Sequence, residues 1–263
     1  METIKILIAV KTYPCRSDKY VETVCTAGFR EDGSWIRLYP IPFRLHDNQY
    51  AKYQWIEAKI EKNTTDMRPE SYRIVDIDNI KLLDKVDTKN NWQERRNFIF
   101  SNNKIYKNLT EVIDLARNND LSLAIFKPTK IIDFVVENVE LKERDENYKY
   151  VLAQSNLFEI EEYKKVWLMP LLSKKFFYIF EDEQGKKSKL LIEDWEICQL
   201  YLNCKRREPT EEMAIQKVKE KYWDNFAFKK DLHFFLGTTL QWHRRRAKNP
   251  FVITGVFYPP LPK

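Results

Sequence analysis

An aromatic and basic stretch, residues 35–44, carries the side chains in this chain that are best suited to binding anions. Trp35 and Ile36 begin it, two prolines stiffen its end, and basic and aromatic residues alternate between them. Aromatic rings stack on bases and arginines contact phosphates, so the pattern is typical of a nucleic-acid-binding surface. The alternative is a core strand with solvated arginines. We expect Trp35 and Ile36 in the core, and the candidate binding residues of this region are Lys11, Tyr13, Lys19, Tyr20, Arg37, Tyr39 and Arg44.

A second basic region, residues 241–250, is the densest run of positive charge in the chain. It lies between two predicted strands, and a basic loop that also carries an aromatic ring can contact phosphates or a minor groove. The alternative is a solvated hairpin loop. The candidate residues here are Trp242, Arg244, Arg245, Arg246 and Lys248.

Carboxylates near residues 181–196 raise the possibility of a metal-dependent nuclease centred on Asp182, Glu193 and Asp194. The alternative is structural, with residues 182–185 in a polar hairpin and Glu193 or Asp194 capping a helix. The remaining metal-ligand types do not have the spacing of a structural zinc site; these are Cys198, Cys204, His233 and His243. The sequence therefore identifies no catalytic residues, and we expect no metal and no cofactor.

Composition limits the classes of function. The formal net charge of +6 and the pI near 8.9 favour anionic partners only mildly. Five glycines leave little material for a phosphate-binding loop. The four cysteines form no C-x-x-C pair, and the sequence contains no signal peptide and no apolar run long enough to span a bilayer. We therefore expect a cytoplasmic protein with reduced thiols and no membrane association.

The first 160 residues are predicted to be mainly β. Alternating apolar residues predict strands at 3–12, 21–29, 53–62 and 71–83, with a turn at residues 30–33, and together these suggest a small barrel. Helices are predicted at 91–96 and 109–117, the second capped by Asn108 or Thr110. Strands are then expected at 122–126, 129–141 and 148–154, with a hairpin tip at 144–147.

The last hundred residues are predicted to form an α+β module of order ββααββ. The expected strands are 174–180, 188–192, 231–239 and 251–257, and the two helices begin at Glu193 or Asp194 and at Thr210. The predicted fold class is therefore α+β, with tandem OB-like β-barrels, a helical insertion and this C-terminal module. The predicted domains are 1–88 (first barrel), 89–120 (insertion), 121–162 (second barrel part) and 163–263 (C-terminal domain).

Two short motifs resemble a known family. Residues 24–28 (VCTAG), followed by 32–37 (DGSWIR), are similar to the start of dual OB-fold domain proteins, which occur in bacterial mobile-element and defence-associated loci. Phe126-Lys127-Pro128 is similar to the step that begins their second barrel half, so Lys127 joins the candidate binding residues. The resemblance covers about residues 1–160 and implies OB-like barrels and nucleic-acid binding. After Arg37 the sequence departs from the family pattern.

These observations lead to three functional hypotheses. The first is a non-catalytic protein that binds DNA or RNA, acting as the sensor or accessory part of a bacterial defence or mobile-element system. Its partners would be nucleic acid and, in such a locus, a protein from a neighbouring gene. The second is the metal-dependent nuclease, and the third is a protein-interaction scaffold in which the barrels are structural.

Overall fold

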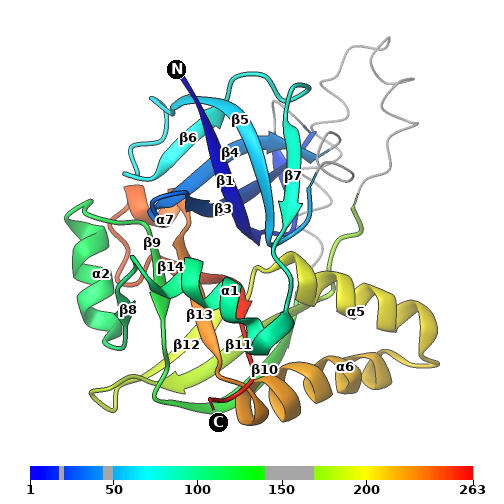
Figure 1. Cartoon of the computed structure of the whole chain (residues 1–263). Helices are drawn as coiled ribbons and strands as arrows, with labels where there is room; N and C mark the ends of the chain where they lie inside the picture. The colour runs from blue at the N-terminus through cyan, green and yellow to red at the C-terminus, as the bar shows by residue number, and fades with distance from the viewer. Residues whose placement is uncertain (18–20, 44–49, 140–168, 263) are drawn as a thin grey trace.

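The computed structural model describes residues 1–17, 21–43, 50–139 and 169–262 and shows a mixed α+β protein, as expected (Figure 1). The strands are β1 (Glu2–Lys11), β2 (Cys15–Ser17), β3 (Val21–Arg30), β4 (Trp35–Pro42), β5 (Gln54–Lys62), β6 (Ser71–Ile74), β7 (Lys81–Lys85), β8 (Ile105–Tyr106), β9 (Leu123–Phe126), β10 (Lys130–Asn138), β11 (Lys174–Glu181), β12 (Lys187–Leu191), β13 (His233–Thr238) and β14 (Phe251–Phe257). The helices are α1 (Lys89–Phe100), α2 (Leu109–Arg117), α5 (Trp195–Arg207), α6 (Glu211–Lys219), the π-helix η2 (Glu220–Ala227) and α7 (Leu240–Arg244). No helix of the described ranges is long and apolar enough to cross a membrane.

The N-terminal half forms a closed five-stranded barrel, which confirms the predicted barrel in this region. Its strands pair in the order β1-β3-β4-β6-β5, and β5 pairs with β1 to close the ring. All these pairs are antiparallel except β4 with β6. The predicted strand at 71–83 is two strands, because β6 ends at Ile74 and β7 begins at Lys81 and pairs with β5.

Two glycines explain why the motif residues fold as they do. A Cβ atom at Gly28 would lie 2.1 Å from the main-chain oxygen of Leu7, so only glycine lets β3 approach β1 this closely. Gly33 has a φ of 82° in the turn between β3 and β4, and Asp32 accepts a hydrogen bond from the Ser34 main-chain nitrogen at 2.9 Å. The predicted turn is confirmed.

The C-terminal half contains two sheets, with the orders β10-β11-β12 and β14-β13-β9-β8. β9 pairs with β13, and β10 pairs with β11, so the strands expected in a second barrel join the sheets of the C-terminal half. A second closed barrel is not present among the strands that the structure describes. The strand predicted at 148–154 and its hairpin tip lie outside the described residues.

Side-chain caps start three of the helices at the predicted positions, whereas the helix predicted at 91–96 is α1, which begins at Lys89 without a side-chain cap. Asn108 caps α2 by accepting hydrogen bonds from the Thr110 and Glu111 main-chain nitrogens, and Asp194 caps α5. Thr210 caps α6 in the same way. The basic run at 241–250 was expected to be a loop, but its first part is the helix α7, because Thr239 caps it by accepting a hydrogen bond from the Trp242 main-chain nitrogen.

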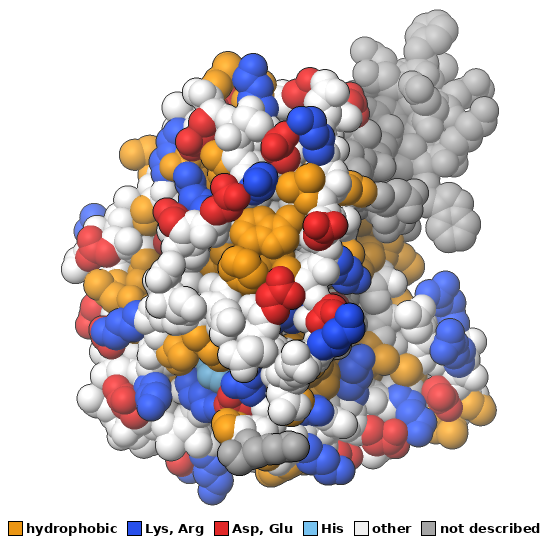
Figure 2. Space-filling model, in the orientation of Figure 1, with side chains coloured by type: hydrophobic (Ala, Val, Ile, Leu, Met, Phe, Trp, Pro, Cys, Tyr) orange, Lys and Arg blue, Asp and Glu red, His pale blue; other side chains and the backbone are white. Residues whose placement is uncertain are grey.

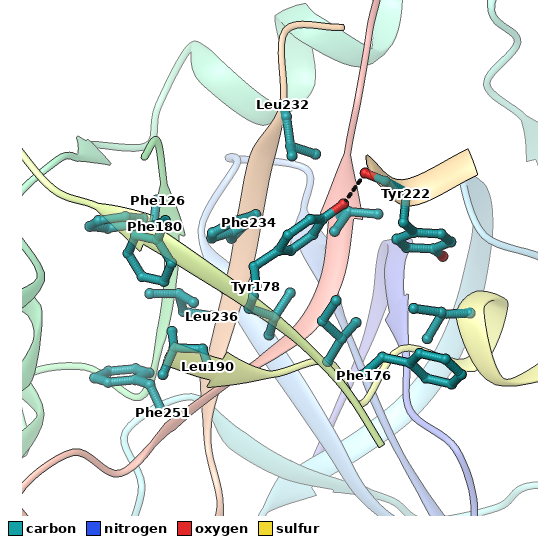
Figure 3. Close-up of a cluster of buried hydrophobic side chains, with 14 of the residues drawn as sticks. Phe126, Phe176, Tyr178, Phe180, Leu190, Tyr222, Leu232, Phe234, Leu236 and Phe251 are labelled. Atoms are coloured by element: carbon teal, nitrogen blue, oxygen red, sulfur yellow. Dashed lines mark hydrogen bonds between the residues drawn. The ribbon is translucent and has the colours of Figure 1, made fainter. Parts of the chain in front are cut away.

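The core is continuous across the two halves. Phe29 and Trp35 of the barrel pack on Phe235 of β13, and Tyr53 packs on Phe257 of β14. A second cluster fills the C-terminal half, where the aromatic rings of β9, β11 and β13 interlock (Figure 3). In this cluster the buried Tyr178 hydroxyl donates to the main-chain oxygen of Tyr222 at 2.6 Å. The two halves therefore share buried surface.

Candidate functional site

A cationic groove lies between the barrel and helix α5. Its volume is about 520 Å³, and it is lined from the end of β1, the loop before β5, β7, α1, α5, η2 and the segment after β14. Among the described residues of the lining, one carboxylate, Glu196, lies with a larger set of basic side chains. These are Lys11, Lys52, Lys85, Arg95 and Lys221. Lys and Arg side chains are interspersed with carboxylates on the face of the molecule drawn in Figure 2.

Helix α5 presents one face to the groove. Trp195, Gln199 and Asn203 are four residues apart, and this spacing places them along one side of an α-helix. Trp195 is held by two other rings, with centroids 5.8 Å from Tyr13 and 5.7 Å from Phe43. The groove therefore gains two amide side chains and the rim of a fixed aromatic ring.

Lys52 anchors the start of α5 to the barrel. Its Nζ atom lies 2.8 and 2.9 Å from the two Asp194 carboxylate oxygens and 3.2 Å from Glu196. Burial acts to lower the pKa of Lys52, but the two carboxylates outweigh burial and raise it. Burial raises the pKa of Asp194 to about 6 against the opposing effect of Lys52. Lys52 is therefore held in the charged form by groups of the protein itself.

Arg95 is fixed in orientation by aromatic rings and by the backbone. Its guanidinium carbon lies 3.8 Å from the centre of the Tyr53 ring and 5.0 Å from that of Trp92. Its Nε and Nη2 atoms donate to the main-chain oxygen of Val86 at 3.0 and 2.8 Å. Burial lowers the pKa of Arg95. Arg95 is thus a positioned cation in the groove wall.

Lys85 and Lys221 supply exposed positive charge to the groove. Both are exposed, and neither forms an ion pair within the described ranges. Lys11 is half-buried, and its Nζ atom donates to the main-chain oxygen of Tyr50 at 2.9 Å. Long, solvated lysines of this kind bind anions as point charges with little demand on geometry.

Among the described residues predicted from the first basic and aromatic region, only Lys11 lines this groove. Tyr13 is half-buried in the wall behind it, where its hydroxyl donates to the main-chain oxygen of Pro170 at 2.6 Å. Tyr39 is half-buried, and burial raises its pKa. The other three predictions, Lys19, Tyr20 and Arg44, lie outside the described residues.

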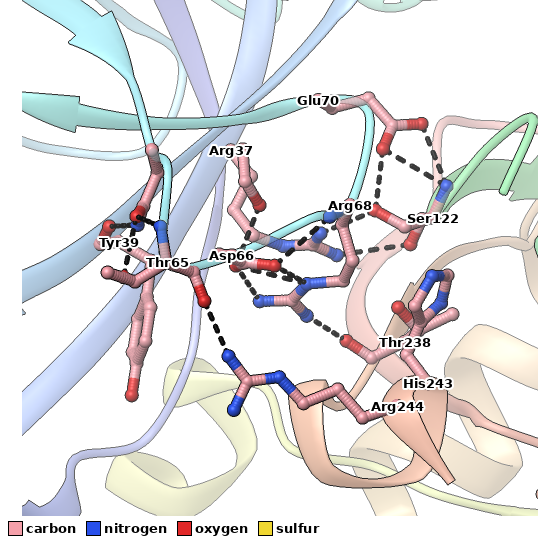
Figure 4. A network of polar contacts seen from close by, with 12 residues as sticks. Arg37, Tyr39, Thr65, Asp66, Arg68, Glu70, Ser122, Thr238, His243 and Arg244 are labelled. Carbon is pink, nitrogen blue, oxygen red and sulfur yellow. Dashed lines mark hydrogen bonds and ion pairs between the residues drawn. The ribbon is translucent and has the colours of Figure 1, made fainter. Parts of the chain in front are cut away.

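Arg37 is not a surface residue, and this part of the prediction is wrong. Its exposed fraction is 1%, because β4 carries it into the seam between the two halves. Its guanidinium donates to the hydroxyl and main-chain oxygens of Ser122, beside Arg68 and Asp66 (Figure 4). The alternation of residues along β4 showed that Arg37 faces away from Ile36. It could not show that the face of β4 that carries Arg37 is also covered, by the C-terminal half of the chain. Ile36 is buried as expected, and Trp35 is partly buried against Phe29.

Lys127 and the basic run occupy other places. Lys127 forms an ion pair with Asp231, which also pairs with Arg96 at 3.1 Å. Trp242 is 40% exposed, and Arg244 donates to the main-chain oxygen of Thr65 at 2.5 Å. The remaining members of the run are exposed just after α7, and they do not line the groove; these are Arg245, Arg246 and Lys248.

The carboxylates of the nuclease hypothesis have structural contacts. Asp182 accepts hydrogen bonds from the main-chain nitrogens of Leu109, Gln184 and Lys186, and Asp194 caps α5 and pairs with Lys52. Within the described ranges, no three His, Cys, Asp or Glu side chains are grouped so that they could hold a metal ion. The three carboxylates are not brought together as that hypothesis requires.

Sequence reasoning missed most of the groove. Lys52, Lys85 and Arg95 come from three separate segments, and no local pattern connects them. The one available signal was the spacing of Trp195, Gln199 and Asn203 on a helix whose start was predicted correctly. The groove exists because the barrel and α5 meet, and that contact depends on tertiary structure.

The fold and the groove define a two-part α+β protein with a cationic surface at its seam. A family model described as Domain of unknown function (DUF8757) matches residues 106–263, more than half of the chain, so the chain belongs to this family. A second model, Domain of unknown function (DUF8758), matches residues 2–101. No curated protein matches the chain. The groove is lined by residues from both matched segments.

Proposed function

We propose that this protein binds DNA or RNA through the cationic groove, mainly by contacts to phosphates. The observation that carries the proposal is the lining of the groove: its described residues include five basic side chains, of which Lys52 is paired with Asp194 and Glu196, and one carboxylate. A groove with such an excess of cations concentrates a polyanion by releasing its counterions. The closed barrel agrees with an OB-like domain, a fold that commonly binds single strands.

The groove favours backbone contact over base stacking. Trp195 is already packed between Tyr13 and Phe43, and Tyr258 is stacked on Phe226 with ring centroids 3.8 Å apart. These rings shape the groove but have faces occupied by other rings. We therefore expect binding that depends strongly on salt and weakly on base sequence.

The resemblance of the first 160 residues adds a biological setting to the proposal. In this setting, the protein is a non-catalytic sensor or accessory factor of a bacterial defence or mobile-element system. A partner protein from a neighbouring gene fits the same setting. The nucleic-acid interaction can be tested without knowing that partner.

The test replaces the two exposed lysines of the groove, Lys85→Glu with Lys221→Glu. Fluorescence anisotropy would follow labelled oligonucleotides of about 20 nucleotides, as single-stranded DNA, RNA and duplex DNA, at several salt concentrations. We expect the double variant to bind about tenfold or more weakly, with a salt dependence reduced by about one unit per lost phosphate contact.

Lys59→Glu is the matched control, because Lys59 is exposed on β5 and does not line the groove. It should retain most of the affinity of the unmodified protein. The proposal fails if no oligonucleotide binds at low salt. It also fails if Lys59→Glu weakens binding as much per charge as the groove variant, since the interaction would then reflect net charge alone. Salt-resistant copurification of a protein without nucleic acid would favour the scaffold hypothesis instead.

A further inference from the structure

A second, smaller cavity lies inside the seam between the barrel and the C-terminal sheets. Its volume is about 230 Å³. Much of its wall is apolar and comes from both halves; this part includes Val10, Ala27, Leu123, Phe176, Leu191 and Val252. Such a lining, with a few polar groups at fixed positions, is characteristic of small-molecule sites.

The polar part of this wall contains a buried cation without a carboxylate partner. Arg37 is 1% exposed and forms no ion pair within the described ranges. The buried cations Lys52 and Arg68, by contrast, pair with Asp194 at 2.8 Å and Asp66 at 2.5 Å. A buried charge is costly unless an opposite charge compensates it. Arg37 is therefore a buried cation of the cavity wall that is linked to a carboxylate, Glu70, only through the Ser122 hydroxyl.

Two polar atoms of the same wall have no hydrogen-bond partner among the residues that the structure describes. They are the Nε atom of Arg37 on β4 and the Oγ1 atom of Thr238 on β13, and Thr238 is 4% exposed. Each such atom costs about 1–3 kcal/mol when left unsatisfied in a protein interior. The two residues come from the two halves of the chain and line one cavity, so a single ligand in that cavity would lie next to both.

The remaining charges of the lining favour an anion. Arg68, Lys174 and Lys175 also line the cavity, and Glu193 is the one acidic residue among the described residues of the lining. Arg68 is neutralised by Asp66, and Lys174 lies 3.1 Å from Glu211. Lys175 is exposed and forms no ion pair within the described part of the chain. Arg37 and Lys175 are thus the basic side chains of the described lining that form no direct ion pair with a described carboxylate.

We propose that this cavity binds a small organic anion with an apolar body. Its carboxylate or phosphate group would lie against Arg37 and Thr238, and its apolar part against the aliphatic and aromatic wall. The cavity is smaller than the pockets that hold drug-sized ligands, so the ligand is a compact molecule and not a polymer. The proposal is independent of nucleic-acid binding in the groove.

The experiment measures binding of four probes to the full chain by thermal shift and isothermal titration calorimetry. Benzoate and hexanoate carry a carboxylate, phenyl phosphate carries a phosphate, and benzamide is a neutral analogue of benzoate. We expect at least one anionic probe to raise the melting temperature and bind measurably, and benzamide to do neither. The comparison between benzoate and phenyl phosphate identifies the preferred anionic group.

Thr238→Val is the diagnostic variant, because it removes an unsatisfied hydroxyl at nearly constant shape and should not impair folding. It should weaken binding of the anionic probe about tenfold. Thr254→Val is the matched control: Thr254 lines the same cavity, but its hydroxyl already donates to the main-chain oxygen of Phe235 at 3.1 Å. The control should bind the probe with an affinity close to that of the unmodified protein.

Four results would overturn the proposal. The first three are the absence of binding by every anionic probe, equal binding of benzamide and benzoate, and equal effects of Thr238→Val and Thr254→Val. The groove variant Lys85→Glu with Lys221→Glu should bind the probe normally, because neither lysine lines the cavity. Loss of probe binding in that variant would show that the anion binds in the groove, and would also overturn the proposal.

Discussion

His233 shows how strongly the interior of this protein can disfavour a charge. It is buried on β13 beside Phe100 and Phe257, and its Nδ1 atom lies 2.9 Å from the main-chain oxygen of Asp231. Burial lowers its pKa from 6.5 to about 4, and Lys127 acts in the same direction, against the effect of Asp231. The folded protein therefore keeps this imidazole neutral where the unfolded chain would protonate it.

This shift predicts a loss of stability in mild acid. Because the folded-state pKa of His233 is below the unfolded-state value, the unfolded state binds the proton first as the pH falls. Protonation of His233 therefore costs no stability above pH 6.5. As the pH falls toward 4, it lowers the free energy of unfolding by up to about 3 kcal/mol. His233→Gln should remove this component, as measured by urea unfolding over a pH series. Parallel stability curves for the two proteins across this range would contradict the prediction.

For single residues, the sequence predicted some positions correctly and misplaced others. Gly33 and Asp32 predicted their turn because the backbone there needs a positive φ that glycine adopts easily. Arg37 was misplaced because the same alternation describes a strand with one solvated face and a strand covered on both faces. Only the partner of that second face, Ser122, distinguishes the two cases, and it is 85 residues away.

Among the elements, α5 depends most directly on a contact with the other half of the chain. Lys52, from the loop before β5, pairs with the residue that caps the helix, Asp194. Both side chains are buried, so removing one partner leaves the other as an uncompensated charge. The start of α5, and with it one wall of the groove, is therefore fixed by the barrel.

Lys52→Met should destabilise the protein by about 3–5 kcal/mol, because it leaves the Asp194 carboxylate buried and unpaired. The double variant Lys52→Met with Asp194→Asn removes both charges and keeps a capping side chain, so it should recover part of the loss. Urea unfolding of the four proteins in the cycle measures the coupling. Additive effects of the two substitutions would show that the pair contributes no interaction of its own.

Helix starts were predicted well and strand partners poorly, for a physical reason. Asn108, Asp194 and Thr210 satisfy main-chain nitrogens within three residues, so the signal is local. The partner of β9 is β13, more than a hundred residues later, and no local pattern encodes that choice. The helix α7 was missed because its charged residues resemble a solvated loop, although Thr239 was available as its cap.

At the scale of the whole molecule, the two halves do not have separate interiors. Arg68 of the barrel donates to the main-chain oxygen of Thr238, and Glu70 accepts from the Ser122 main-chain nitrogen at 2.8 Å. One core cluster includes residues of both β3 and β13. Each half would expose this shared apolar surface if the other unfolded.

We therefore expect the chain to unfold in one cooperative transition. Tryptophan fluorescence reports on the barrel as well as the C-terminal half, whereas far-UV circular dichroism is dominated by helices such as α5 and α6. The urea midpoints from the two signals should coincide. Two separated transitions would show that the halves are independently stable and that the shared core contributes little.

One wall of the molecule belongs to both proposed sites. Thr12 and Tyr13 line the cavity beside Lys11, which lines the groove, and Trp195 of the groove stacks on Tyr13 from the other side. A bridge between Thr12 and Asp194 ties the two strips of chain together. Any movement of this wall on binding would couple the two sites. Such coupling is reciprocal: the factor by which a small anion changes oligonucleotide affinity must equal the factor by which the oligonucleotide changes affinity for the anion.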